Sequence, residues 1–268
     1  MKVVPSHHGW RWLARGWTLF TASPFMWLTM IFAYWLLVGF VGLVPVVGAA
    51  AAVVLIPVFS VSFMAMCRAL ERRRPLEPGL LFAGFRANLP ALLTLGGIYL
   101  VASAAILAAS ATVDDGHLMR WMLAGTAVPQ EAFADGSVLN AALLALALYL
   151  PVLAAFWFAP VLAAWDAMPA AKALFYSFFA VLANWRAFLV YGMVVAAVGT
   201  IVPGIAVAFV GAALQASPEV RTVVPAFVLM FFIGLMPTLF ASFYASYRDV
   251  FPPAPPDAAP PEPASPAG

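Results

Sequence analysis

Long stretches without a charged side chain are the feature that most constrains the fold of this chain. Residues 16–67 contain no Asp, Glu, Lys or Arg, and the same holds for 87–113, 136–165, 187–218 and 222–247. One helical crossing of a bilayer needs roughly 20 apolar residues. The first stretch is long enough for two crossings and each of the others for one, so the sequence predicts six transmembrane helices.

The composition supports a membrane protein and argues against several other classes. Hydrophobic residues make up 65% of the 268 residues and charged residues only 9%, whereas soluble globular domains carry about 25% charged residues. The net charge of +2 is too small to indicate a nucleic-acid partner. A single cysteine, Cys67, cannot form an intrachain disulfide. We therefore expect an all-α polytopic transmembrane bundle.

The basic residues predict the orientation of this bundle. The predicted spans are 24–44, 46–67, 89–110, 138–165, 187–212 and 223–246. Of the 13 Lys and Arg residues, all except Arg120 and Arg221 then fall on the side of the two termini. Short loops rich in Lys and Arg stay in the cytoplasm. Both termini are therefore predicted to be cytoplasmic.

Three regions follow from this map. Residues 1–23 are expected to form a cytoplasmic amphipathic segment at the membrane interface, and residues 24–251 form the six-span membrane domain. Residues 252–268, PPAPPDAAPPEPASPAG, are rich in proline and are predicted to be a disordered cytoplasmic tail. The only sizeable outer loop is 111–137.

The even-numbered spans share a sequence pattern that predicts a threefold repeat. PVFSVSFMAMCR begins at Pro57 and PTLFASFYASYR at Pro237, an offset of 180 residues, and PVLAAFWFAPVL begins at Pro151. Aromatic-rich segments precede the odd-numbered spans: GWTLFTASP, LLFAGFRANLP and ALFYSFFAVLANWRAF. The predicted unit is an interfacial helix followed by a helical hairpin, used three times, an arrangement common in membrane proteins.

The first interfacial segment carries the aromatic and basic residues of a membrane anchor. As a helix, residues 10–20 place Trp10, Trp17 and Phe20 on one face and Arg11 and Arg15 on another. Such a helix lies in the headgroup plane, where Trp rings and Arg side chains are favoured. The predicted interfacial anchors are Trp10, Trp12, Trp17, Arg11 and Arg15.

Two adjacent histidines, His7 and His8, precede this helix. Helical metal ligands are usually spaced i, i+4, and adjacent residues point about 100° apart. We therefore expect no metal site and interpret both histidines as residues that face the headgroups.

Arginines cluster after the second span, at Arg68, Arg72, Arg73, Arg74 and Arg86. They are candidates for contact with an anionic lipid headgroup, at about 1 kcal/mol per residue. The alternative is that they serve only to orient the protein in the membrane. On the fifth predicted span, small residues recur near every fourth position, including Gly192, Gly199 and Gly204. They are expected to pack against another helix of the chain, with a dimer face as the alternative.

The sequence contains no recognisable catalytic constellation. It has no HExxH, no Walker A loop and no G-x-S-x-G motif, and no Asp, Glu, Lys, Arg or His lies in the middle of a predicted span. Coupled pumps usually carry such residues because they relay charge. We therefore expect neither an enzyme nor a cofactor.

Four short segments resemble an uncharacterised family of proteobacterial inner-membrane proteins with about six helices: GWTLFTASP at 16–24, RALE at 68–71, VLANWRAF at 181–188 and YRDVF at 247–251. The likeness covers residues 10–251 and departs at Leu19 and Phe20, where an acidic or basic residue often precedes the Phe. The resemblance implies a multi-pass protein of the bacterial cytoplasmic membrane. It implies no substrate, reaction or site.

These observations favour an accessory or structural membrane component that binds lipid or another membrane protein. The main alternative is a permease or channel for a small, weakly polar or lipid-like solute. That alternative requires a continuous cavity lined by hydroxyls from this set: Ser62, Thr94, Ser103, Thr200 and Ser242. An enzyme would instead need Asp166, Arg186 or the acids of the outer loop to converge around a pocket.

Overall fold

The computed structural model describes residues 1–45, 47–213 and 220–252, and within them the side chains of 206, 207, 209–213 and 220–230 are not described. The described residues form helices and no strand. The helices are α1 (His8–Thr21), α2 (Pro24–Gly42), α3 (Val47–Glu71), η1 (Pro78–Arg86, a 3₁₀ helix), α4 (Leu89–Ala111), α5 (His117–Ala124), α6 (Gln130–Ala134), α7 (Ser137–Phe156), α8 (Ala159–Trp165), α9 (Ala170–Ala183), α10 (Trp185–Ala213) and α11 (Val220–Val250). The predicted tail lies, from residue 253 onward, outside the described residues.

The predicted all-α membrane bundle is confirmed. Five helical segments are long and apolar enough to cross a bilayer: Pro24–Gly42, Val47–Glu71, Leu89–Ala111, Ser137–Trp165 and Trp185–Ile205. The sixth predicted span falls within the 31-residue helix α11. About six spans therefore agree with the observed helices.

The fourth span differs from the prediction because it is broken into α7 and α8. Pro160 lies in the first turn of α8 and has no N–H to continue the bonding of α7. The backbone N–H of Phe158 donates instead to Ser177 Oγ on α9, at 2.9 Å. A side chain from α9 thus satisfies a backbone donor that the break in the helix leaves free.

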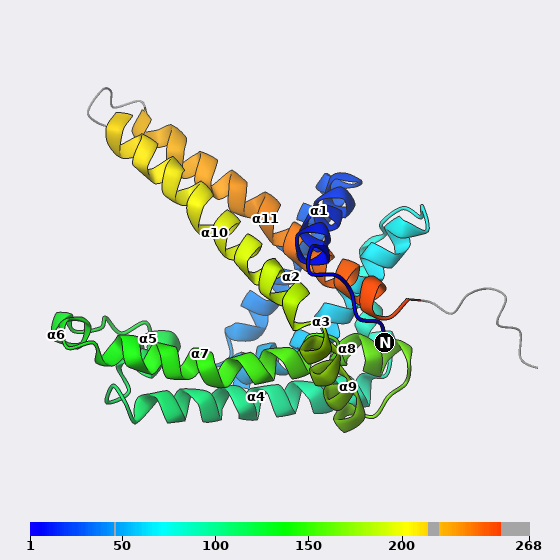
Figure 1. Ribbon diagram of the computed structural model, residues 1–268, viewed down its shortest axis with the longest axis horizontal. Coiled ribbons are helices and arrows are strands. Elements are labelled where there is room, and N and C mark those ends of the chain that lie inside the picture. Colours follow the sequence, from blue (N-terminus) through cyan, green and yellow to red (C-terminus); the bar gives the residue numbers. More distant parts are fainter. Residues whose placement is uncertain (46, 214–219, 253–268) are drawn as a thin grey trace, which may run out of the picture.

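The chain contains the predicted order of a short helix followed by a hairpin three times. The hairpins are α2–α3, α4–α7 and α10–α11, and the helices α1, η1 and α9 precede them (Figure 1). Each short helix packs on the second helix of another hairpin: η1 on α3, α9 on α7 and α1 on α11. The N-terminal helix therefore closes a ring by packing on the C-terminal one.

Small residues allow the backbones to approach closely at these contacts. A Cβ on Gly84 of η1 would lie 1.9 Å from the carbonyl oxygen of Val58, and one on Gly16 of α1 would lie 2.3 Å from that of Thr238. Gly84 N–H also donates to Ser62 Oγ at 2.9 Å. On α9 the small residue is Ser177, whose hydroxyl donates to the carbonyl of Ala154.

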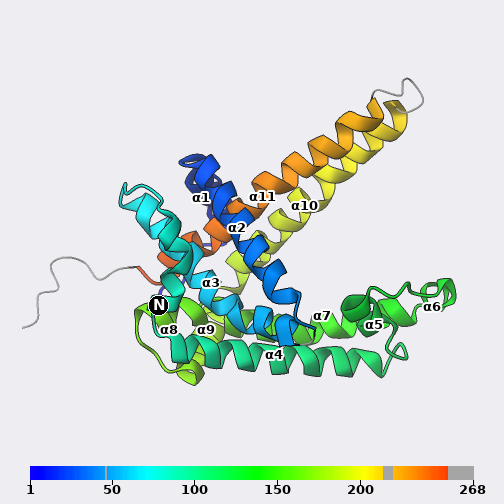
Figure 2. The same ribbon diagram turned by 180° about the vertical axis from the view of Figure 1, so that it is seen from behind.

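The largest buried side chains lie where the short helices meet the ends of the hairpins, a region that we call the hub. Trp12, Trp27, Phe63 and Phe158 are almost fully buried there. Away from the hub, the α10–α11 hairpin diverges from the α4–α7 hairpin in both views (Figures 1 and 2). The diverging arms expose apolar side chains such as Leu146 and Met193, as expected of surfaces that face lipid.

The predicted packing role of the glycines on the fifth span is not seen against any residue whose side chain the structure describes. A Cβ on Gly192, Gly199 or Gly204 would meet no atom within 4 Å among the described residues. The glycines that do bring helices together include Gly84 and Gly96. Spacing alone could not distinguish the two groups, because a small residue that faces lipid has the same apolar pattern as one that faces a helix.

Candidate functional site

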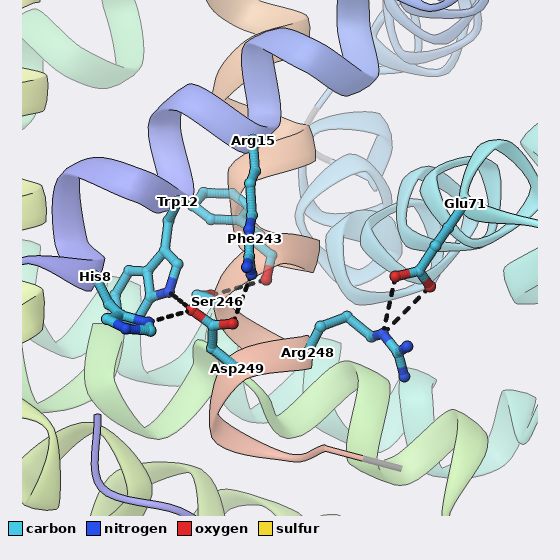
Figure 3. A network of polar contacts seen from close by, with 8 residues as sticks. All are labelled: His8, Trp12, Arg15, Glu71, Phe243, Ser246, Arg248 and Asp249. Carbon is cyan, nitrogen blue, oxygen red and sulfur yellow. Dashed lines mark hydrogen bonds and ion pairs between the residues drawn. The ribbon is translucent and has the colours of Figure 1, made fainter. Parts of the chain in front are cut away.

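A partly buried carboxylate, Asp249, joins α1 to the last turn of α11 at the hub (Figure 3). Its oxygens accept hydrogen bonds from His8 Nδ1 at 2.7 Å, Trp12 Nε1 at 2.9 Å and Arg15 Nη1 at 2.6 Å. The three donors follow one another at intervals of four and three residues, so a single face of α1 presents all of them. Burial opposes ionisation of Asp249, but the hydrogen bonds from His8, Trp12 and Arg15 outweigh it and lower the pKa.

This network corrects two of the predictions for the N-terminal segment. Trp12 is fully buried and bonds Asp249, so it is a core residue and does not anchor the protein in the headgroup region. His8 also faces Asp249 rather than the headgroups. Trp10 and Trp17 are more than half exposed and Arg11 is exposed. No group of three metal-ligating side chains occurs among the described residues.

The N-terminal segment is also tied to the hub by its backbone. Val4 N–H donates to Asn184 Oδ1 at 2.8 Å, and Lys2 N–H donates to the carbonyl of Val250, also at 2.8 Å. Asn184 Nδ2 donates back to the carbonyl of Lys2. These bonds hold the first residues of the chain beside the end of α11.

A polar recess of about 790 Å³ lies where α3, α8 and α11 end. Arg68 and Glu71 reach it from α3, and Arg72 directly follows that helix. Tyr247 and Arg248 reach it from α11. Its remaining lining includes Met1, Trp165, Asp166, Tyr244 and Phe251. The residues that line it thus come from the N-terminus and from the ends of α3, α8 and α11, so the recess exists only in the assembled hub.

One acid in the recess already has a hydrogen-bond partner and an ion-pair partner. Glu71 accepts a hydrogen bond from the hydroxyl of Tyr244 at 2.5 Å. It also pairs with Arg248, whose Nε lies 3.2 Å from Glu71 Oε2, as Figure 3 shows. Arg68 places its guanidinium 4.9 Å from the centre of the Trp165 ring. Within the described part of the chain, neither Arg68 nor Arg72 forms an ion pair. Two guanidinium groups are therefore available to an anion.

Tyr247 adds a neutral donor to the same wall. Burial raises its pKa to about 12; the charge of Asp166 also raises it, while Arg68 and Arg248 lower it. The hydroxyl therefore stays protonated at neutral pH and can donate a hydrogen bond. Cationic and neutral donors around one recess are the groups that bind phosphate oxygens.

The structure divides the predicted arginine cluster. Arg68 and Arg72 line the recess, and Arg74 joins them around an adjacent depression of about 300 Å³. Arg73 and Arg86 are exposed and line neither space. The cluster is therefore not a single site, although its members are close in sequence.

Sequence reasoning missed the contribution of α11 to this recess. Arg248 is the repeat equivalent of Arg68, at the offset of 180 residues that relates the second and sixth spans. Both arginines line the recess. The repeat was therefore the signal that could have identified Arg248 and its neighbours Tyr244 and Tyr247.

The residues that an enzyme would need are not brought together. Asp114 accepts hydrogen bonds from the backbone N–H groups of Gly116 and Leu118, and Asp135 accepts one from Ser137 N–H. These acids lie at the far end of the α4–α7 hairpin, whereas Asp166 lies in the recess at the hub. Arg186 stacks on Trp185. These residues therefore do not converge around one pocket.

A second cavity, of about 220 Å³, lies between the hairpins beyond the hub and is mostly apolar. Phe63, Trp157 and Phe243, which occupy equivalent positions of the repeat, all line it. The hydroxyls required by a permease do not line this cavity. Four of them donate to backbone carbonyls of their own helices: Ser62, Thr94, Thr200 and Ser242.

Comparison with known proteins gives the family. The chain is 39% identical over 254 residues, 92% of each sequence, to a protein of Burkholderia thailandensis described as a probable inner membrane protein. No protein-family model matches the chain, and no solved structure matches it. The predicted resemblance to an uncharacterised family of inner-membrane proteins is confirmed. The chain belongs to the family of this Burkholderia protein.

Proposed function

We propose that this protein is an accessory component of the bacterial inner membrane that binds an anionic lipid headgroup in the recess at the hub. The observation that carries the proposal is the pair of guanidinium groups, Arg68 and Arg72, that have no carboxylate partner among the described residues. The tyrosine hydroxyl of Tyr247 in the same wall supplies a donor that persists at neutral pH. In this proposal, the protein acts by binding the lipid and carries out no reaction.

The proposed orientation places the recess and both termini on the cytoplasmic side. Eleven of the 13 basic residues belong to the segments predicted to be cytoplasmic. The described parts of these cytoplasmic segments lie at the hub, while α5 and α6 lie at the opposite end of the molecule (Figure 1). Anionic lipids give the cytoplasmic leaflet a negative surface potential, which attracts basic residues near its surface. Both observations support a headgroup as the ligand.

A permease pathway has weaker support. Between the recess and the apolar cavity, α3 and α8 carry the buried side chains of Met64, Cys67, Leu162 and Ala163, which are at most 2% exposed. Along α3 and α8, they lie between residues that line the cavity and residues that line the recess, which supports a packed layer between the two spaces. A solute would have to displace this layer in order to cross.

Removing the two recess arginines tests the proposal. We expect Arg68→Gln with Arg72→Gln to weaken binding of phosphatidylglycerol or cardiolipin roughly 30-fold, because each basic residue near an anionic surface contributes about 1 kcal/mol. The affinity is measured by native mass spectrometry of the full-length protein released from nanodiscs of stated lipid composition. The matched control is Arg73→Gln with Arg86→Gln, which removes the same charge outside the recess.

The outcome of this experiment separates the possible ligands. Weak binding in the recess variant with normal binding in the control supports the site, and phosphatidylcholine should bind poorly to both. Equal losses in the two variants would show that only total charge matters and would contradict the proposal. Competition by inorganic phosphate alone, with no preference for the lipid, would identify a free anion as the ligand and contradict the lipid assignment.

A further inference from the structure

The apolar cavity beyond the hub contains a polar feature that the headgroup proposal does not use. Tyr99 on α4 and Tyr149 on α7 both line the cavity, and their hydroxyl oxygens lie 2.5 Å apart. Two hydroxyls carry two hydrogens, and their mutual bond uses one of them. One O–H group of the pair is therefore free to donate to a ligand.

A third tyrosine faces the same space. Tyr34 on α2 lines the cavity, is only half-buried, and makes no side-chain hydrogen bond among the described residues. Ser60 on α3 lines the cavity as well. Hydroxyls from different hairpins thus converge on one apolar space. A buried hydroxyl gains most from a partner that accepts its hydrogen.

The walls of the cavity are mainly aromatic. Its rings come from every hairpin and include Phe59, Phe156 and Phe240 in addition to the repeat-equivalent Phe63, Trp157 and Phe243. Aromatic walls favour a flat ring, which can stack on them or meet their edges. Among the residues that the structure describes, no charged one lines the cavity, so the environment favours a neutral ligand.

The size of the cavity limits how much of a ligand it holds. Its volume of about 220 Å³ is below the roughly 300–1,000 Å³ of typical small-molecule sites. It equals about seven water molecules at roughly 30 Å³ each, which suits one substituted six-membered ring. The remainder of a larger ligand must lie outside the cavity.

The arrangement of the hairpins provides a route for that remainder. The cavity touches α7 and α11, and beyond it the hairpins that contain these helices diverge (Figures 1 and 2). The side chains exposed along the diverging arms, such as Leu146, are apolar. A hydrocarbon tail attached to a ring in the cavity could therefore extend into the bilayer without crossing the packed layer.

We propose that the cavity lined by Tyr34, Tyr99 and Tyr149 binds the ring of a neutral quinone-type lipid, with its carbonyl oxygen accepting a hydrogen bond from the tyrosine pair and its isoprenoid tail between the hairpins. This lipid class combines a flat ring, hydrogen-bond acceptors, no charge and a long apolar tail. The proposal concerns binding and includes no redox step. It does not depend on the headgroup site, from which the packed layer separates the cavity.

The test uses decylubiquinone as the probe and the full-length protein in detergent. Binding is followed by quenching of tryptophan fluorescence and by the ligand-dependent increase in melting temperature. We expect saturable binding to the wild type. Tyr99→Phe with Tyr149→Phe should weaken it about three- to tenfold, the effect of losing one hydrogen bond. Tyr176→Phe, which removes a hydroxyl from α9 outside the cavity, is the matched control and should bind normally.

Two further arms distinguish recognition of the ring from partitioning into detergent. Decylbenzene carries the same tail without an acceptor and should bind more weakly than decylubiquinone. Ser60→Leu fills part of the cavity and should also weaken binding, and a melting temperature equal to that of the wild type shows that it folds. If this variant fails to fold, the tyrosine pair still decides the result.

Three results would overturn the proposal. These are an unchanged affinity in the double tyrosine variant, equal affinity for decylbenzene, and tighter binding of tetraphenylphosphonium, which would identify an aromatic cage for cations. The double variant of Arg68 and Arg72 should bind decylubiquinone normally. Failure of the headgroup site and failure of the ring site are therefore distinguishable.

Discussion

Asp249→Ala is expected to destabilise the folded protein by about 3 kcal/mol, because it removes the shared acceptor of three hydrogen bonds. The indole N–H of Trp12 would remain buried without a partner, and α1 would lose its polar attachment to α11. For a chain of this size, about 3 kcal/mol corresponds to a decrease in melting temperature of roughly 6–12 °C. The decrease can be measured by thermal unfolding of the purified protein in detergent.

A second carboxylate provides the control for this prediction. Asp166 is exposed. Its side chain forms no hydrogen bond or ion pair with another described residue. Asp166→Ala should therefore change the stability by less than about 0.5 kcal/mol. If the two variants unfold at the same temperature, then Asp249 does not hold α1 on α11. In that case, the contact that closes the ring of short helices is not stabilised by this network.

Gly96→Ala is expected to disrupt the packing of α3 on α4. A Cβ at Gly96 would lie 2.0 Å from the carbonyl oxygen of Val54 and 2.7 Å from its carbonyl carbon. Backbone atoms cannot rotate away as a flexible side chain can, so the two helices would have to separate. Overpacking of this kind typically costs about 1–3 kcal/mol and occasionally more. We expect a value at or above the upper end.

The neighbouring glycine offers a matched control on the same helix. A Cβ at Gly97 would meet nothing within 4 Å, and Ala is favoured over Gly in a helix by up to about 1 kcal/mol. Gly97→Ala should therefore be neutral or slightly stabilising. Thermal unfolding of the two variants should give shifts of opposite sign or of very different size. Equal destabilisation by both would contradict the close approach of α3 and α4.

The general architecture could be predicted from the sequence because the bilayer imposes it. A span needs a long apolar helix whose backbone groups are all bonded internally, and this requirement is visible as uncharged stretches. The repeat was also visible, since Pro57 and Pro237 begin similar segments. The structure adds that the short helix of each unit packs on another hairpin, a contact between residues far apart in the sequence.

The side-chain environments could not be predicted in the same way. In a soluble protein, an apolar face indicates burial in the protein, but in a membrane the solvent is itself apolar. Trp10, Trp12 and Trp17 therefore look alike in the sequence, although Trp12 is fully buried and the other two are more than half exposed. The glycines at 96 and 97 differ for the same reason.

The candidate sites were only partly predictable. The arginine cluster pointed to a basic region after the second span, and Arg68 and Arg72 do line the recess. The role of Asp249 as the acceptor of three hydrogen bonds was missed, because its donors on α1 are more than 230 residues away in the chain. The tyrosine pair was also missed, since Tyr99 and Tyr149 are 50 residues apart and follow no recognised motif.

The most direct test concerns the membrane orientation on which the headgroup proposal rests. Alkaline phosphatase, which is active only in the periplasm, is fused after residue 125 in one protein and after residue 75 in another. The predicted topology gives an active enzyme after residue 125 and an inactive one after residue 75, and green fluorescent protein at the same sites gives the opposite pattern. An inactive phosphatase after residue 125 together with an active one after residue 75 would place the recess outside the cell and contradict the topology.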